Sequence, residues 1–195
     1  MRANCYLLIH GNNCLIIDPG DEADFILEQL QRQKLVPLGI IATHGHFDHL
    51  MAVGEIQASF KTPLFISQKD LFLLKHLSDA AKYFLGYDPS ILPVKNIKYL
   101  ENGKLKISNF KFEIIGTPGH TPGSCSLYFK NEEVLFTGDT LFKQGIGRYD
   151  FSYSSKIDLK TSLKTILSLP KKIVVYPGHG EKTTIEEELN SFKTF

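Results

Sequence analysis

The chain contains Thr43-His44-Gly45-His46-Phe47-Asp48-His49-Leu50, an eight-residue stretch with three imidazoles and one carboxylate. The apolar run 38–42 before it predicts a buried strand, and residues 51–56 after it begin a helical pattern. Open α/β sheets place their ligand sites at the carboxyl ends of strands. Imidazole nitrogen and carboxylate oxygen are ligands that borderline divalent metals prefer. The stretch therefore predicts a metal site rather than a solvated loop rich in histidine.

Strand and helix patterns alternate around this stretch, which favours a layered α/β domain. Residues 5–10 and 13–18 predict a hairpin around Gly11-Asn12, and Asp21 is expected to cap the helix that follows. The longest helical pattern covers residues 68–86, with apolar side chains at every third or fourth position. Further strands are expected at residues 63–67, 97–100, 104–107, 110–115, 124–129, 134–136 and 173–176, and further helices at residues 155–169 and from Thr184.

The composition is that of an ordinary globular protein, and 195 residues suffice for one well-buried domain, expected over residues 1–195. A net charge of +1 does not indicate binding to nucleic acid or to a membrane surface, because both are strongly anionic and attract basic proteins. The apolar run 5–9 is too short for a signal segment or a membrane span, so we expect a cytoplasmic protein. Cys5, Cys14 and Cys125 fit no metal spacing, and we interpret them as buried thiols in a reducing compartment.

Three more candidate ligands follow predicted strands further along the chain. His120 lies in a turn whose prolines and glycines fix the backbone, as the positioning of one imidazole requires. Asp139 and His179 each stand beside a glycine just past a β-rich run. One such residue is usually structural, but three of them together with the cluster at 44–49 indicate a single shared site. His10 and His76 lack this turn chemistry and are interpreted as surface or packing residues.

This series of residues resembles the metallo-β-lactamase-fold hydrolases from Leu8 to about Glu188, which is nearly the whole chain. Within that superfamily, four motifs resemble the glyoxalase II group, the hydroxyacylglutathione hydrolases and their shorter bacterial relatives. The motifs are Thr117-Pro118-Gly119-His120-Thr121-Pro122-Gly123-Ser124, Gly138-Asp139-Thr140-Leu141-Phe142, Gly145-Ile146-Gly147-Arg148-Tyr149-Asp150-Phe151 and Pro177-Gly178-His179-Gly180.

The resemblance implies a single-domain, four-layer αββα sandwich with a metal site at one edge of its two sheets. It also implies two divalent metal ions, with Zn²⁺ expected first and Fe or Mn as alternatives. By position, His44, His46 and His120 would bind one metal, Asp48, His49 and His179 the other, and Asp139 both. Asp18 would hold the metal loop by hydrogen bonds without binding metal.

The implied reaction is hydrolysis of a small thioester of the S-lactoylglutathione type. Two metals with two carboxylates and a hydroxide leave a net charge of about +1, which suits polarising a carbonyl oxygen. The hydroxide, available at neutral pH because the metals lower the pKa of water, attacks the thioester carbonyl. Asp48 and Asp139 are the catalytic candidates for accepting a proton, and the residues do not distinguish between them.

Two departures from glyoxalase II bear on the substrate. Glyoxalase II carries a helical C-terminal domain that grips glutathione, whereas this sequence ends about fifteen residues after His179, so we do not expect the same grip on glutathione. The group's Lys-x-Tyr contact is also altered, because Arg148 keeps the positive charge but Asp150 replaces the tyrosine. Arg148 is a candidate for binding a substrate carboxylate, and a structural surface arginine is the alternative.

Other functions of the same fold stay open at this point. Gly147-Arg148 followed by Asp150 also resembles persulfide dioxygenases, which use one iron and would leave the second site unfilled. The cluster at 44–49 also serves nucleases and β-lactam hydrolases, although the near-neutral charge argues against a dedicated nuclease. A binding module without catalysis is the remaining alternative.

Overall fold

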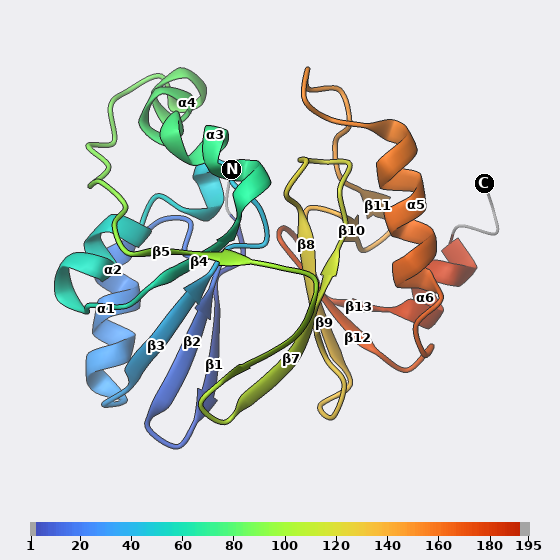
Figure 1. Ribbon diagram of the computed structural model, residues 1–195, viewed down its shortest axis with the longest axis horizontal. Helices are drawn as coiled ribbons and strands as arrows, with labels where there is room; N and C mark the ends of the chain where they lie inside the picture. Colours follow the sequence, from blue (N-terminus) through green and yellow to red (C-terminus); the bar gives the residue numbers. More distant parts are fainter. Residues whose placement is uncertain (1–2, 192–195) are drawn as a thin grey trace.

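The computed structural model describes residues 3–191 and contains two central sheets with helices on their outer faces (Figure 1). The first sheet has the order β1-β2-β3-β4-β5, and the second has the order β13-β12-β9-β8-β7-β6. Helices α1 and α2 lie beside the first sheet, and α5 and α6 lie beside the second (Figure 1). This arrangement confirms the predicted four-layer αββα sandwich.

The first half of the chain forms the first sheet and its helices. The β1–β2 hairpin turns at Gly11-Asn12, as predicted, and the later strands of this sheet run parallel to their neighbours. The elements are β1 (Tyr6–His10), β2 (Asn13–Ile17), α1 (Ala23–Arg32), β3 (Val36–Ile41), the 3₁₀ turn η1 (Phe47–His49), α2 (Val53–Ser59), β4 (Leu64–Ser67), the 3₁₀ turn η2 (Gln68–Asp70), α3 (Leu71–Lys75), α4 (Leu77–Leu85) and β5 (Ile97–Leu100).

The second half is β-rich before it returns to helix, as the sequence predicts. Strands β6 to β9 form an antiparallel meander, and β12 joins β9 in parallel. The elements are β6 (Gly103–Ile107), β7 (Phe110–Gly116), β8 (Cys125–Phe129), β9 (Val134–Gly138), β10 (Leu141–Phe142), β11 (Gly145–Ile146), α5 (Lys156–Leu167), β12 (Val174–Pro177), β13 (Thr183–Thr184) and α6 (Ile185–Ser191).

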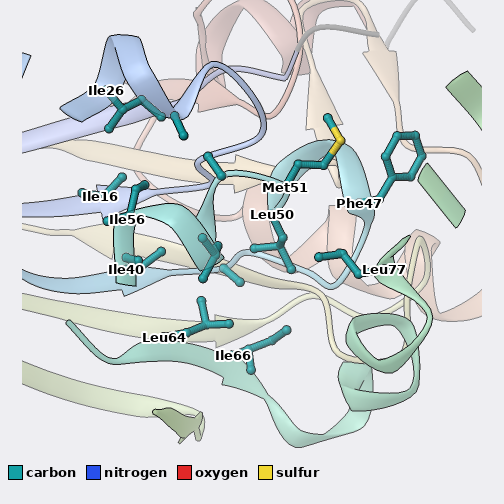
Figure 2. Close-up of a cluster of buried hydrophobic side chains, with 14 of the residues drawn as sticks. Ile16, Ile26, Ile40, Phe47, Leu50, Met51, Ile56, Leu64, Ile66 and Leu77 are labelled. Atoms are coloured by element: carbon teal, nitrogen blue, oxygen red, sulfur yellow. The ribbon is translucent and has the colours of Figure 1, made fainter. Parts of the chain in front are cut away.

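Three layers of apolar side chains hold the sandwich together. In β2, Cys14 and Ile16 face the cluster under α1 and α2, whereas Leu15 and Ile17 face the cluster between the sheets. Figure 2 shows the first of these clusters, in which Leu50, the last residue of the stretch that carries the candidate ligands, is fully buried. Burying a side chain of this size contributes about 1.5–3 kcal/mol relative to leaving it exposed. The core therefore fixes the segment that carries the candidate ligands.

Two local predictions were wrong. The pattern over residues 68–86 is not one helix, because η2, α3 and α4 replace it and His76 leaves the helical conformation with φ −105° and ψ 20°. Leu74 before the break and Leu77 after it pack against the same core cluster, so the two short helices bend around it. Asp21 does not cap α1, since its Oδ1 accepts a hydrogen bond from the adjacent Glu22 amide, and Glu22 occupies the cap position without a side-chain bond.

The cysteines are unpaired in the structure, and Cys14 lies opposite Ile9 across the hairpin. Burial raises the pKa of the Cys5 thiol to about 12 and that of Cys14 to about 11, and it also raises the pKa of Cys125.

We predict that iodoacetamide at pH 8 leaves the three thiols of the folded protein unmodified, because the thiolate is the nucleophile and little of it is present at this pH. Intact-mass spectrometry should show all three thiols alkylated in urea and none without it. Modification of the native protein would contradict these raised thiol pKa values, which belong to two buried cysteines, Cys14 and Cys125, and to the partly buried Cys5.

Among residues 3–191, no helix is both long and apolar enough to span a membrane.

Candidate metal centre

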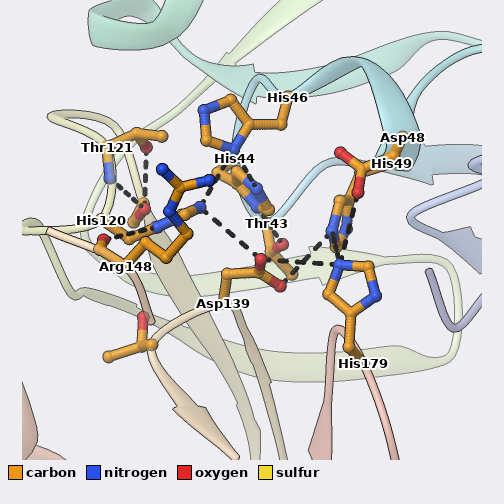
Figure 3. Close-up of polar contacts among 12 residues, drawn as sticks. Thr43, His44, His46, Asp48, His49, His120, Thr121, Asp139, Arg148 and His179 are labelled. Carbon is orange, nitrogen blue, oxygen red and sulfur yellow. Dashed lines mark hydrogen bonds and ion pairs between the residues drawn. The ribbon is translucent and has the colours of Figure 1, made fainter. Parts of the chain in front are cut away.

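Seven side chains from four loops meet at one edge of the sandwich (Figure 3). Each loop follows a strand of the sheets: β3, β7, β9 or β12. Open sheets gather ligands at such strand ends because neighbouring loops there converge. Three groups of three residues have ligand atoms within 4.8 Å of one another: one contains Asp18 with His44 and His49, and the other two contain only candidate metal ligands. These two groups are His44, His46 and His120, and Asp48, His49 and His179.

The first group consists of three imidazoles aimed at one point. The Nδ1 atom of His46 lies 3.2 Å from Nε2 of His44 and 3.0 Å from Nε2 of His120. Nδ1 of His120 donates to the carbonyl oxygen of Arg148 at 2.8 Å, so the inward Nε2 of the neutral ring carries a lone pair. Burial lowers the pKa of all three rings, that of His46 to about 4. These imidazoles are therefore neutral at pH 7 and present lone pairs to a common point.

The second group combines imidazoles with a carboxylate. Nε2 of His179 lies 3.3 Å from Nε2 of His49 and 3.4 Å from Oδ2 of Asp48. Burial alone would lower the pKa of His49, but Asp139 and Asp18 outweigh it and hold that pKa well above its usual value. Burial would raise the pKa of Asp48, but the hydrogen bond from His179 and the nearby His49 outweigh it and lower that pKa to about 2. The group therefore holds a carboxylate that stays ionised at neutral pH.

Asp139 lies between the two groups. Its carboxylate is 3.4 Å from Nε2 of His49, 3.6 Å from Nε2 of His120 and 3.6 Å from Nε2 of His179. Its Oδ1 atom is buried and accepts no hydrogen bond, which is costly for a carboxylate oxygen unless a cation is close, and in this structure the close group is Nε2 of His49 at 3.4 Å. Imidazole nitrogens and carboxylate oxygens that converge on one another are the donor set that two divalent metals require, and His49 would release its proton on binding metal. The residues present therefore fit a dinuclear centre.

Asp18 lies behind the centre. Its Oδ1 accepts from the Thr43 amide at 2.8 Å, and its Oδ2 accepts from the Thr43 hydroxyl at 2.6 Å and lies 3.0 Å from Nδ1 of His49. Its backbone has φ 49°, in the left-handed region that aspartate tolerates better than most residues. Asp18 also lies within 4.8 Å of His44 and His49. Its two oxygens, however, already face the Thr43 amide, the Thr43 hydroxyl and Nδ1 of His49.

The sequence analysis missed Asp70, a fully buried carboxylate. It accepts hydrogen bonds from the Gly45 amide at 2.9 Å, the Gly123 amide at 2.6 Å and the Thr121 hydroxyl at 2.6 Å. It therefore joins the loop of His46 to the loop of His120. Its sequence signal is its position three residues past β4, the same kind of strand end that carries the metal candidates.

A cavity of about 320 Å³ opens over the centre and reaches Asp48, Asp139 and His179. Arg148 lines it, and its guanidinium donates to both carboxylate oxygens of Asp150 at 2.9 Å. His76 also lines the cavity and is exposed, with Nδ1 3.5 Å from Asp79, which agrees with a surface residue. His10 is exposed as well, far along the β1–β2 hairpin.

Comparison with known proteins agrees with this geometry. A family model described as "Metallo-beta-lactamase superfamily" matches residues 1–179. The chain is 37% identical over 194 residues to the hydroxyacylglutathione hydrolase GloC of Haemophilus influenzae, covering 97% of this chain and 91% of that protein.

Two solved structures have the same fold over nearly their full length. TTHA1623, in a di-iron-bound form, has a TM-score of 0.89 at 35% identity and covers 97% of this chain and 93% of its own. The B3 metallo-β-lactamase BLEG-1 has a TM-score of 0.89 at 36% identity and covers 96% of this chain and 91% of its own. The chain therefore belongs to the metallo-β-lactamase superfamily.

Proposed function

We propose that this metallo-hydrolase cleaves small thioesters of the S-lactoylglutathione type, using two divalent metal ions, with Zn²⁺ as the first candidate. The observation that carries the proposal is the buried carboxylate of Asp139, which lies between two three-residue groups at the base of a cavity and has one oxygen that accepts no hydrogen bond. The motifs around His120 and Asp139 and the similarity to GloC support a thioester over other bonds. The substrate is a small molecule, and the enzyme works in the cytoplasm.

Metal ions held here supply a Lewis acid for the carbonyl oxygen and bring the pKa of water to about 7. In the balanced reaction, water adds to the thioester carbon, the carbon–sulfur bond breaks, and the sulfur leaves with the electron pair. The products are a carboxylate, a thiol and one proton. The pKa values of Asp48 and Asp139 are lowered, so both side chains are anionic and are the candidate proton acceptors, but as weak bases they would depend on the metal ions to make the bound water acidic.

Hydrolysis of S-lactoylglutathione by the metal-loaded protein tests this proposal. We expect kcat/KM of about 10⁴ M⁻¹s⁻¹ or more, and we expect dipicolinate to abolish turnover as it removes the metal. Elemental analysis of the same sample is the control, with about two metal ions per chain expected. Absence of turnover on every thioester, with both metals bound, would overturn the proposal.

Hydrolysis of β-lactams is a second candidate, because BLEG-1 is a B3 metallo-β-lactamase at 36% identity. A nitrocefin assay on the same sample compares the two activities. The one-iron oxidation of persulfides has less support, since Asp48, His49 and His179 complete a second group of ligand atoms. One iron per chain together with oxygen uptake on a persulfide would favour that alternative.

A further inference from the structure

We propose that the cavity over the metal centre selects thioesters by an apolar group next to the thioester bond, and that no glutathione peptide is required for recognition. This inference rests on the proposed function and adds the chemical class of its substrate. It follows from the two walls of the cavity and from the charges at its mouth.

The first wall comes from the broken helix and from the metal-binding stretch. Leu73 on α3, and Ala80 and Phe84 on α4, line the cavity. The Phe84 ring stacks on Phe47 with centroids 5.6 Å apart and planes at 10°. Phe47 lies between two of the candidate metal ligands, His46 and Asp48. The apolar wall therefore begins beside the candidate metal centre.

The second wall comes from the β10–β11 hairpin and the segment after it. Phe142 and Ile146 come from the two strands of the hairpin, and Phe151 and Tyr153 continue the wall. The rings of Phe151 and Tyr153 stack with centroids 5.4 Å apart and planes at 13°, and the Tyr153 hydroxyl lies 2.8 Å from Nε2 of His46. The substrate space therefore has aliphatic or aromatic surface on both sides of the centre.

The charges at the mouth do not match glutathione. Arg148 is the one lysine or arginine among the lining residues that the structure describes, and its guanidinium lies 4.4 Å from the Phe151 ring. Both oxygens of Asp150 hold it, so the pair presents no net charge to a substrate. Glutathione carries two carboxylates, and a carboxylate that approached Arg148 would also meet the anionic Asp150. The ion pair between Arg148 and Asp150 is exposed and therefore contributes little to stability, but the negative charge of Asp150 still repels an anionic substrate group.

The size of the cavity agrees with this preference. About 320 Å³ is at the small end of ligand pockets, which suits one acyl or thiol substituent better than a whole tripeptide. Each methylene transferred from water to apolar walls improves binding by about fourfold until the space is filled. The apolar group can belong to the acyl or to the thiol part, and both satisfy the same walls.

The test uses two series of neutral thioesters with the metal-loaded enzyme. One series lengthens the acyl group of N-acetylcysteamine thioesters from acetyl to hexanoyl, and the other lengthens the thiol part of acetyl thioesters from methyl to hexyl. In at least one series we expect kcat/KM to rise about three- to fourfold per methylene, and its longest member to exceed S-lactoylglutathione about tenfold or more. The inference would be overturned if kcat/KM stayed constant along both series, or if kcat/KM for S-lactoylglutathione exceeded that of every member of both series. In either case the proposed function would stand. Failure of every thioester would instead remove the proposed function.

A binding measurement gives a second readout that does not depend on turnover. Thioether analogues lack the carbonyl and cannot be hydrolysed, so calorimetry can compare S-methyl- with S-hexyl-N-acetylcysteamine. We expect tighter binding of the hexyl compound, with a negative heat-capacity change from apolar burial. Equal affinities of the two compounds would count against an apolar subsite.

Two variants connect the preference to the walls. Phe84→Ser is expected to lower kcat/KM for the preferred six-carbon substrate about tenfold, with a smaller loss for the shortest member of its series. Ile146→Thr tests the opposite wall with a smaller change of shape, should the first variant fold poorly. Phe25→Ser is the matched control, because Phe25 is 57% exposed on α1 and does not line the cavity. Equal losses in the control and the wall variants would contradict the assignment.

Discussion

Replacing Asp139 by alanine is expected to remove about one of the two metal ions and to lower thioester hydrolysis about a thousandfold. The reason is position, since the carboxylate lies 3.4–3.6 Å from imidazole nitrogens of both groups. Its buried Oδ1 atom accepts no hydrogen bond and lies 3.4 Å from Nε2 of His49, so a metal ion held between these two groups would satisfy both. Elemental analysis after gel filtration, followed by the thioester assay, measures both effects.

Two further variants make this experiment specific. Asp139→Asn keeps the shape and one acceptor oxygen but loses the negative charge, so metal content between wild type and Asp139→Ala is expected. Arg148→Ala should keep both metals, because the Arg148 side chain contacts Asp150 and not the centre, and only its backbone carbonyl accepts from His120. Equal metal content in Asp139→Ala and Arg148→Ala would refute a bridging role for Asp139.

The site could be predicted from the sequence because its residues occupy strand ends. The strand before His44 is buried on both faces, so it reads as an uninterrupted apolar run, and the polar residues after it stand out. The loops of His120, Asp139 and His179 repeat this arrangement after other strands. The layered fold follows from the same alternation of elements.

Other features leave too weak a local signal. The apolar period continues through His76, so the pattern does not distinguish one long helix from two short ones that bend around the core. The β10–β11 hairpin pairs only two residues on each strand, too few to show alternation. Both features form walls of the cavity, and the substrate preference therefore had to come from the structure.

Asp70 illustrates a different limit. Its partners Gly45 and Gly123 lie 25 and 53 residues away, and no local pattern connects them. A lone aspartate after a strand is usually a surface residue, and only the fold shows that this one is fully buried. Burial raises its pKa, against the hydrogen bonds from Thr121, Gly123 and Gly45.

Asp70→Ala is expected to destabilise the metal-free protein by about 3–5 kcal/mol, measured by urea unfolding. The substitution leaves the Gly45 and Gly123 amides buried without an acceptor, whereas the Thr121 hydroxyl retains Ser124 at 2.7 Å. Asp70→Asn should cost less, because its amide oxygen still accepts one of these bonds. Asp79→Ala is the matched control, since the Asp79 side chain is 83% exposed, and it should change stability by less than about 0.5 kcal/mol.

Asp70→Ala should also affect the metal affinities of the two groups of candidate ligands differently. Asp70 ties the loop of His46 to the loop of His120, which belong to one group of ligand atoms, and it does not contact Asp48, His49 or His179. Metal affinity at the first group should therefore fall about 10–100-fold, the range for partners that orient ligands, while the second group keeps its metal. Competitive titration with a chelator resolves the two affinities. An equal loss at both groups would mean that Asp70 acts through overall stability, and unchanged affinities would mean that the two loops hold their positions without it.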